Sequence, residues 1–166
     1  MKKQIGVLLI IGLAIFSSGP ATEKQSLNVL IQSADRLWKE RENLEKAEQA
    51  LALWKKASAQ DPEREELWVK TSRACAWIGE FYEGANRELI YQEGIKSAER
   101  AIKLKPRSVG GNFWMVINMG RLTEARGITS GSFELGMFIK NLTIVAEEDP
   151  AYYYGGLYLM WGRTFY

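Results

Sequence analysis

The residues best suited to chemistry in this sequence are a tryptophan, an asparagine and an arginine on one predicted helix. Trp114, Asn118 and Arg121 stand at positions i, i+4 and i+7, a spacing that aligns side chains on one helix face. An arginine can bind a carboxylate through two parallel hydrogen bonds, and a tryptophan ring can cover an apolar body. The spacing therefore indicates a binding stripe for a ligand that joins an acidic group to an apolar one.

The same three residues also have a purely structural interpretation. In that case Trp114 belongs to the core, Asn118 caps a neighbouring backbone group, and Arg121 extends its charge into solvent along its aliphatic stem. Both interpretations stay open at the level of sequence, because each is compatible with a polar and a charged residue beside an aromatic one.

Amphipathic aromatic residues near the C-terminus offer a similar choice. Tyr153 and Tyr154 suit either a pocket wall or a contact with another chain, and Trp161 lies on the apolar side of a predicted last helix. The candidate ligand- or partner-binding residues are therefore Trp114, Asn118, Arg121, Tyr153, Tyr154 and Trp161.

The sequence lacks the residues that catalytic sites and metal sites most often use. The 166 residues include no histidine, so Ser-His-Asp and Cys-His catalysis and histidine metal sites are absent. Cys75 is the single cysteine, and its small and apolar neighbours indicate a buried apolar residue rather than a reactive thiol. No carboxylate pair has apolar flanks, and no glycine-rich phosphate loop with lysine occurs. We therefore expect a non-enzymatic protein with no catalytic residues, no metal and no cofactor.

The N-terminal segment has the layout of a secretory signal peptide. Lys2 and Lys3 precede an apolar run over residues 5–16, and small residues follow up to Ala21. The run is shorter than the roughly 17–25 residues that a membrane-spanning helix needs. We therefore expect residues 1–21 to be cleaved on export, the alternative being an uncleaved N-terminal anchor. No cysteine near Ala21 offers a site for lipid attachment.

The charge of the predicted mature chain argues against nucleic-acid binding. The whole chain has 22 Lys and Arg against 20 Asp and Glu, so removal of Lys2 and Lys3 leaves no net charge. Nucleic-acid binders usually carry a basic surplus gathered on one face. We therefore expect no nucleic-acid partner.

Three prolines divide the chain at equal intervals. Pro62, Pro106 and Pro150 are 44 residues apart, and each follows a charged residue and a predominantly helical segment. Periods of roughly 20–50 residues are typical of stacked supersecondary units. Asp61 and Asp149 precede their prolines in the manner of helix caps, which predicts a proline at the first position of the next helix.

Between the prolines, apolar residues recur with the period of an α-helix. Leu44, Ala47, Leu51 and Trp54 recur at steps of three and four, and charged residues fill the other face. The pattern predicts an all-α chain of about seven antiparallel helices joined by short turns. These helices are expected at residues 27–41, 43–60, 63–82, 84–104, 107–127, 131–148 and 151–165.

The spacing inside one unit resembles the tetratricopeptide repeat (TPR). Ala50, Trp54, Ala57 and Pro62 stand at the spacings of the alanine, aromatic, alanine and proline in the second half of a TPR. The unit is roughly 10 residues longer than the TPR length of about 34, and HEAT or armadillo repeats of about 40–47 residues are the structural alternative. The expected fold is a TPR-like α-solenoid of helix hairpins over residues 22–166 with a 44-residue repeat. Its last unit lacks a second helix, as in a C-terminally truncated version.

Longer segments resemble one particular family of helical-repeat proteins. They cover residues 34–41, 102–106, 118–127 and 149–156. These segments are similar to the TatT-like family, the TPR proteins associated with tripartite ATP-independent periplasmic (TRAP) transporters.

This resemblance implies a periplasmic binding or adaptor protein for TRAP-type solute uptake. It implies contact with a TRAP solute-binding protein, a role for a small organic ligand, and association into a homo-oligomer. Some relatives carry a lipid-attachment cysteine, and relatives continue beyond Gly162 and Arg163; this chain departs from both features. The alternative function is a general TPR scaffold for protein–protein interaction in the cell envelope.

Overall fold

The computed structural model describes residues 20–127 and 135–165, with side chains at 26–127, 135–156, 158 and 162. Within this part the chain is all-α, as predicted, and forms seven α-helices and one short 3-10 helix, with no strand. The helices are α1 (Pro20–Lys39), α2 (Leu44–Gln60), α3 (Glu65–Ile78), η1 (Gly79–Phe81), α4 (Gly84–Leu104), α5 (Val109–Ala125), α6 (Leu135–Glu148) and α7 (Tyr152–Phe165).

The helix boundaries differ from the predicted ones mainly near the N-terminus and after α3. Helix α1 begins at Pro20 rather than at residue 27, so the expected cleavage point lies in its first turn. Helix α3 ends at Ile78 rather than at residue 82, because the chain tightens into η1. Residues 1–19, which hold most of the predicted signal peptide, and residues 131–134 of the predicted sixth helix lie outside the described residues.

Each of the three equally spaced prolines occupies the second position of a tight turn between two helices. The backbone N–H three residues on donates to the carbonyl before each proline, in the pairs Arg64–Asp61 (3.2 Å), Ser108–Lys105 (2.8 Å) and Tyr152–Asp149 (3.1 Å). Proline is favoured at this turn position because its ring fixes φ near the value that the turn needs. The 44-residue period of the sequence is therefore also a period of backbone geometry.

The predicted role of Pro62 and Pro150 as the first residues of helices is wrong. Helix α3 begins at Glu65 and helix α7 at Tyr152, each after the proline turn has closed. At α5 the cap is Ser108, whose Oγ accepts a hydrogen bond from the backbone N–H of Gly111 at 2.9 Å. The proline lies inside a turn that is closed by a backbone hydrogen bond, so the helix begins only after this turn. The helix cap is therefore a residue that follows the proline.

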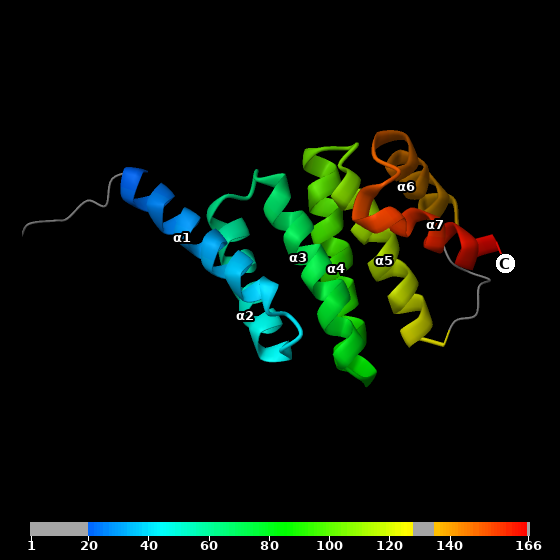
Figure 1. The fold of residues 1–166 in the computed structure, drawn as a ribbon, viewed down its shortest axis with the longest axis horizontal. Helices are drawn as coiled ribbons and strands as arrows, with labels where there is room; N and C mark the ends of the chain where they lie inside the picture. The colour runs from blue at the N-terminus through cyan, green and yellow to red at the C-terminus, as the bar shows by residue number, and fades with distance from the viewer. Residues whose placement is uncertain (1–19, 128–134, 166) are drawn as a thin grey trace, which may run out of the picture.

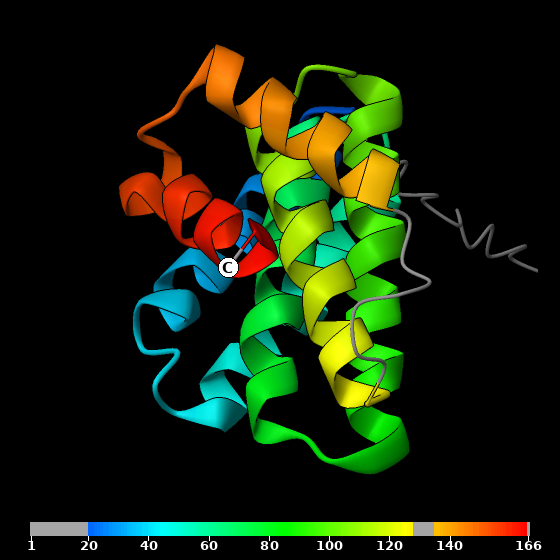
Figure 2. The same cartoon turned by 90° about the vertical axis from the view of Figure 1, so that its right-hand side faces the viewer.

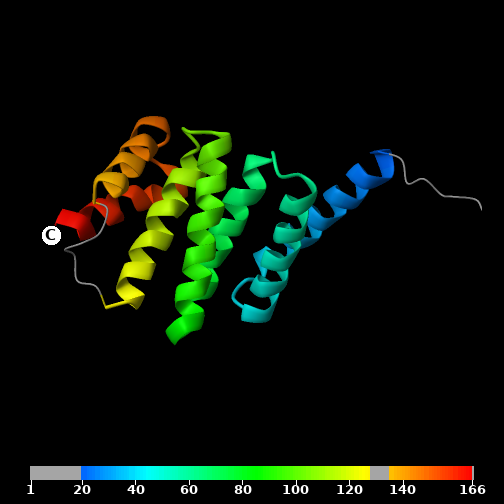
Figure 3. The same cartoon turned by 180° about the vertical axis from the view of Figure 1, so that it is seen from behind.

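The helices follow one another along the molecule as stacked antiparallel hairpins (Figure 1). Each helix from α1 to α6 packs against the next one in the chain, and α3 also contacts α5. The same order is seen from behind in Figure 3. At the end of the row, α7 lies beside α5 and α6 and contacts both (Figure 2). The first helices of successive hairpins therefore lie on one side of the stack.

The TPR-type positions of α2 form the centre of the first part of the core. Ala50, Trp54 and Ala57 are each fully buried, and the small residues allow α1 and α3 to approach α2 closely. Trp54 also contacts Trp38 of α1, with ring centroids 5.4 Å apart. Burial of large apolar side chains contributes roughly 1.5–3 kcal/mol each, so this cluster is a major source of stability. The spacing that resembles a TPR is thus a packing pattern in the fold.

A second part of the core joins α5 and α6 at the other end of the stack. Phe113 and Val116 of α5 and Leu142 and Val145 of α6 are buried there. No helix within the described residues is long and apolar enough to cross a membrane.

Candidate functional site

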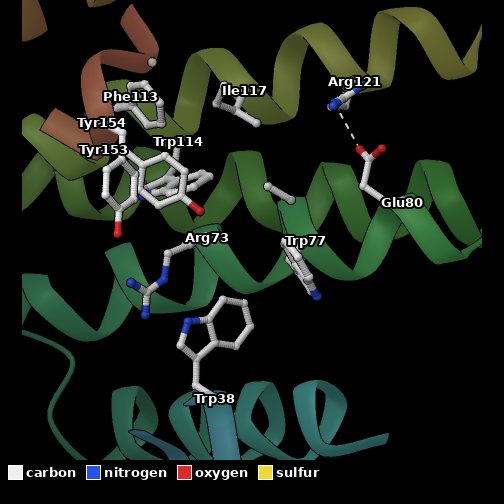
Figure 4. Close-up of a pocket in the computed structure, with 12 residues that line it drawn as sticks. Trp38, Arg73, Trp77, Glu80, Phe113, Trp114, Ile117, Arg121, Tyr153 and Tyr154 are labelled. Carbon is white, nitrogen blue, oxygen red and sulfur yellow. Dashed lines mark ion pairs between the residues drawn. The ribbon is translucent and has the colours of Figure 1, made fainter. Parts of the chain in front are cut away.

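A pocket of about 640 Å³ opens on the side of the stack that the first helices of the hairpins form (Figure 4). Its lining comes from α1, α3, η1, α5 and α7. The residues are Trp38, Arg73, Ala76, Trp77, Glu80, Phe113, Trp114, Ile117, Arg121, Tyr153, Tyr154 and Gly156. A cavity of this size with mainly aromatic walls and few polar groups is typical of ligand-binding sites.

One wall of the pocket is a cluster of aromatic rings from α5 and α7. Trp114 lies edge-on to Phe113, with ring centroids 5.1 Å apart, and edge-on to Tyr153 at 4.8 Å. Edge-to-face pairs of this kind stabilise beyond the area that they bury. The wall is therefore built from residues far apart in the sequence.

The start of α7 has an unusual backbone that brings its tyrosines to the pocket. Tyr153, Tyr154 and Gly155 have φ values of 50°, 60° and 69°, which is left-handed helical geometry inside α7. Left-handed geometry costs an ordinary L-residue about 1–2 kcal/mol. Tyr153 offsets this cost by its ring contacts, whereas Tyr154 is fully exposed at the pocket rim. Strain of this kind is concentrated at functional sites in proteins.

Arg73 on α3 is the polar residue that the sequence analysis missed. Its guanidinium lies over the rings of Trp38 and Trp54, 5.0 and 5.7 Å from their centroids. Its Nε atom is buried and has no hydrogen-bond partner, and Arg73 makes no ion pair within the described part of the chain. Burial lowers the pKa of Arg73 from its ordinary value, because desolvation disfavours the charged form.

The carboxylate of Asp35, whose charge acts on Arg73, is already bound by other groups. Asp35 accepts a hydrogen bond from Trp54 Nε1 at 3.1 Å, and both its oxygens accept from Lys70 Nζ at 2.9 Å. Lys70 in turn pairs with Glu66 at 2.9 Å. Arg73 is thus close enough to feel the charge of Asp35 without hydrogen-bonding to it.

A second arginine lies beside Arg73 and is also without an acidic partner among the described residues. Arg41 lies over Trp38 and Trp77, with its guanidinium carbon 5.4 and 5.2 Å from the ring centroids. It donates only to the backbone carbonyl of Trp38, at 3.4 Å. Two guanidinium groups therefore meet at the ring of Trp38, and their mutual repulsion adds to the lowering of the pKa of Arg73.

Arg121, the predicted carboxylate binder, lies at the other end of the pocket and is already neutralised. Its Nε lies 3.0 Å from Glu80 and its Nη1 lies 3.1 Å from Glu124. The hydroxyl of Tyr91 also donates to Glu80, at 2.9 Å. Figure 4 shows the Arg121–Glu80 pair well separated from Arg73 along the pocket. The structure therefore places Arg121 in an ion-pair network that leaves little of its charge for a ligand.

Asn118 faces away from the pocket. Its side chain is fully buried, and Nδ2 donates to the carbonyl of Trp114 at 2.8 Å and to the carbonyl and hydroxyl of Ser72, both at 3.1 Å. Ile117, one residue earlier, lines the pocket instead. The pocket-facing residues of α5 are therefore Phe113, Trp114, Ile117 and Arg121, at i, i+1, i+4 and i+8. For Asn118 the structural interpretation is the correct one.

Of the other predicted binding residues, three line the pocket and one has a side chain outside the described residues. Trp114, Tyr153 and Tyr154 line the pocket together, whereas the side chain of Trp161 lies outside the described residues. No group of His, Cys, Asp and Glu side chains suited to a metal ion occurs in the part that the structure describes. Cys75 is buried, as predicted, and its thiol has a raised pKa because burial disfavours the thiolate.

One signal could have pointed to Arg73 in the sequence. Arg73 and Trp77 stand at i and i+4 on a helix whose intervening residues are the small Ala74, Cys75 and Ala76. A charged residue in such an apolar stretch faces either solvent or a pocket. The choice depends on Trp38 and Trp54, which come from other helices, and no local pattern brings them to Arg73.

The fold and the pocket together define an all-α helical-repeat protein with an aromatic pocket across its first helices. Residues 30–141 match the sequence profile of a family described as "Regulator of microtubule dynamics protein 1-3" (RMD1-3). The match covers more than half of the 166 residues, so the chain belongs to this family. No match is found among curated proteins.

This family assignment corrects the resemblance to the TatT-like family. The inferred TRAP solute-binding partner, the role in TRAP-type uptake and the periplasmic setting that came with it are wrong, because the matched region belongs to RMD1-3. The segments that carried the resemblance are proline turns, small residues at helix contacts and aromatic packing positions. These features are required by stacked helix hairpins in general, and they do not distinguish one repeat family from another.

Proposed function

We propose that this chain is a non-enzymatic binding module whose pocket takes the apolar side chains of a segment of a partner protein. The observation that carries the proposal is the convergence of aromatic residues from separate helices on one pocket of about 640 Å³, including Trp38, Trp77, Trp114 and Tyr153. Aromatic side chains in a partly open pocket supply most of the binding energy in protein interfaces.

The position of the pocket in the fold is suited to binding a protein segment. The lining runs across the first helices of successive hairpins, from Trp38 on α1 to Arg121 on α5. Repeat proteins use such extended surfaces, formed by successive repeats, to bind partners. The description of the family refers to regulation of microtubule dynamics, so tubulin or a microtubule-bound protein is the first partner to test.

The pocket is tested by selection from a random peptide library displayed on phage, with the whole chain as bait. Ile117 lines the pocket and is replaced in Ile117→Glu, which puts a charge into it. The matched control is Leu89→Glu, because Leu89 lies on α4 outside the pocket and is already 62% exposed. We expect peptides rich in large apolar residues that the wild type and Leu89→Glu retain and Ile117→Glu loses. Failure to enrich any peptide sensitive to Ile117→Glu would rule the proposal out.

The partner is tested with purified tubulin. Microtubule growth is followed by turbidity, and binding by co-sedimentation, with the wild type, Ile117→Glu and Leu89→Glu. We expect the wild type and Leu89→Glu to co-sediment and to change the growth rate, and Ile117→Glu to do neither. If the wild type leaves microtubules unchanged, tubulin is not the partner, and the peptide selection alone decides whether the pocket binds protein segments.

A further inference from the structure

The charge at one end of the pocket is unbalanced. Glu80 is the acidic residue that lines the pocket in the described part of the chain, and it is paired with Arg121 at the far end. At the other end, Arg73 lines the pocket and has no acidic partner among the described residues. An occupant therefore meets a neutral ion pair at one end and the unpaired charge of Arg73 at the other.

The guanidinium of Arg73 is only partly satisfied by its neighbours within the described residues. Its Nε–H is buried without an acceptor, and a buried donor without a partner is destabilising. The rings of Trp38 and Trp54 stabilise the guanidinium by cation–π contact but accept no conventional hydrogen bond from Nε–H. An arriving carboxylate could instead accept hydrogen bonds from the two terminal nitrogens of Arg73, which are not buried as Nε is, in the two-bond geometry that arginine favours.

We infer that Arg73 recognises a carboxylate on the bound segment. The pocket then selects a protein segment in which an acidic residue adjoins a large apolar or aromatic one, the apolar side chain resting against Trp77 and Trp114. Figure 4 shows Arg73 between Trp38 on one side and Trp114 and Tyr153 on the other, in a position to meet both parts of such a segment. This inference rests on the proposed function, because it names the chemistry of the segment that the same pocket binds.

The test repeats the peptide selection with variants that change the charge of Arg73. The bait proteins are the wild type, Arg73→Gln, Arg73→Glu and Arg73→Lys, and each is checked for folding by its circular dichroism and its unfolding midpoint. The control is Lys96→Glu, which reverses a charge at an exposed position of α4 outside the pocket. Individual peptides are then measured by titration in low and high salt, each as a Glu-containing and a Gln-containing pair.

The wild type and Arg73→Lys are expected to enrich peptides with Asp or Glu next to an aromatic residue. Arg73→Gln is expected to lose the acidic preference, and Arg73→Glu to replace it with Lys or Arg. For the wild type, the Glu peptide should bind about tenfold or more tightly than its Gln partner, and the difference should shrink in high salt. Lys96→Glu should keep the acidic preference. A switch of charge preference at position 73 is not expected from a residue with a purely structural role.

Two results would overturn the inference, and they differ in what they say of the proposed function. Pocket-dependent peptides without an acidic preference, or with one that Arg73→Gln and Arg73→Glu leave unchanged, would remove the role of Arg73 and leave the pocket as a protein-binding site. An absence of any peptide sensitive to Ile117→Glu would remove both. If Arg73→Glu fails to fold, Arg73→Gln and the Glu-to-Gln peptide pairs still decide the question.

Discussion

The side chain of Asn118 fills the space beside Gly94, so a side chain at position 94 would have no room. A Cβ atom on Gly94 would lie 2.2 Å from Oδ1 and 2.4 Å from the amide carbon of Asn118. Asn118 is held in place by Ser72, whose own hydroxyl donates to the carbonyl of Gly94 at 2.8 Å. Gly94, Ser72 and Asn118 thus join α4, α3 and α5 at one buried polar contact.

Replacement of Gly94 by alanine is expected to destabilise the fold. A glycine in a helix interior normally gains about 1 kcal/mol when changed to alanine, because alanine is the better helix former. Here the added methyl group must displace a side chain fixed by three hydrogen bonds, and overpacking of a core costs typically 1–3 kcal/mol. We expect a net loss of up to about 2 kcal/mol in the free energy of unfolding, measured by urea denaturation.

Gly136 provides the matched control for this substitution. It lies in α6, and a Cβ atom there would meet nothing within 4 Å. Gly136→Ala should therefore leave the unfolding free energy unchanged or raise it by up to about 1 kcal/mol. Equal effects at positions 94 and 136 would show that the contact with Asn118 has no energetic weight.

The parts of the fold that were predictable from sequence are those fixed by local patterns. The period of Ala50, Trp54 and Ala57 predicts the packed face of α2, and Pro62 predicts the break after it, because both depend on residues close in the chain. The side chain of Asn118 turns to Ser72, 46 residues away. Its inward position therefore depends on tertiary packing, which helical spacing alone does not define.

The candidate site was predictable only in part, for the same reason. Trp114, Tyr153 and Tyr154 were identified as aromatic residues with a polar edge, and all three line the pocket. Arg121 was a candidate because it shares a helix face with Trp114, but its pairing with Glu80 joins residues 41 positions apart. The charge that an arginine offers to a ligand depends on its partners in space, and sequence spacing does not provide them.

Arg121 is expected to contribute little to stability. The ion pair with Glu80 is partly exposed, with side-chain exposures of 36% for Arg121 and 43% for Glu80. Ion pairs of this kind typically contribute about 0–1 kcal/mol. The unfolding free energy of Arg121→Ala should therefore lie within about 1 kcal/mol of the wild-type value by urea denaturation, with a smaller difference in high salt. A loss well above this range would mean that the network of Glu80, Arg121 and Tyr91 acts as one structural unit.

Tyr91 is expected to make the fold sensitive to alkaline pH. Its ring is 2% exposed and its hydroxyl donates to Glu80, and burial followed by this hydrogen bond raises the pKa of its phenol. The folded state therefore keeps the proton to higher pH than the unfolded state, whose tyrosine pKa is about 10. The contribution to stability is complete below about pH 10 and is lost as the pH rises above it.

The measurement is urea denaturation at a series of pH values for the wild type and Tyr91→Phe. The wild type should lose stability as the pH rises above about 10, and Tyr91→Phe should lose less over the same interval. Near neutral pH the variant should be about 1 kcal/mol less stable, because the hydrogen bond to Glu80 is gone. Tyr158→Phe, at a tyrosine that is 67% exposed, serves as the control and should follow the wild type at every pH.

Export with cleavage of the N-terminal segment remains a prediction from the sequence. The apolar run at residues 5–16 and the small residues that follow predict cleavage before Thr22. Mass spectrometry of the protein secreted by an expression host should therefore show an N-terminus close to Thr22. Recovery of the chain with Met1 to Ala21 still attached would favour the uncleaved anchor.

Tyr154 carries the cost of a left-handed backbone without the compensation of burial. Its φ is 60° and its side chain is fully exposed, so a substitution there loses little buried surface. Glycine adopts this region readily, whereas alanine keeps the same penalty of about 1–2 kcal/mol as other L-residues. We therefore expect Tyr154→Gly to be more stable than Tyr154→Ala by about 1 kcal/mol in urea denaturation.

The sign of this difference is what makes the test decisive. In a right-handed helix the order is reversed, and glycine is less stable than alanine by about 1 kcal/mol. Gly162, farther along α7 with nothing within 4 Å of an added Cβ, provides that reference through Gly162→Ala, which should stabilise the protein or leave it unchanged. If Tyr154→Ala instead proves more stable than Tyr154→Gly, the start of α7 is an ordinary right-handed turn in solution. Tyr153 would then not be held against Trp114 in the way that the pocket requires.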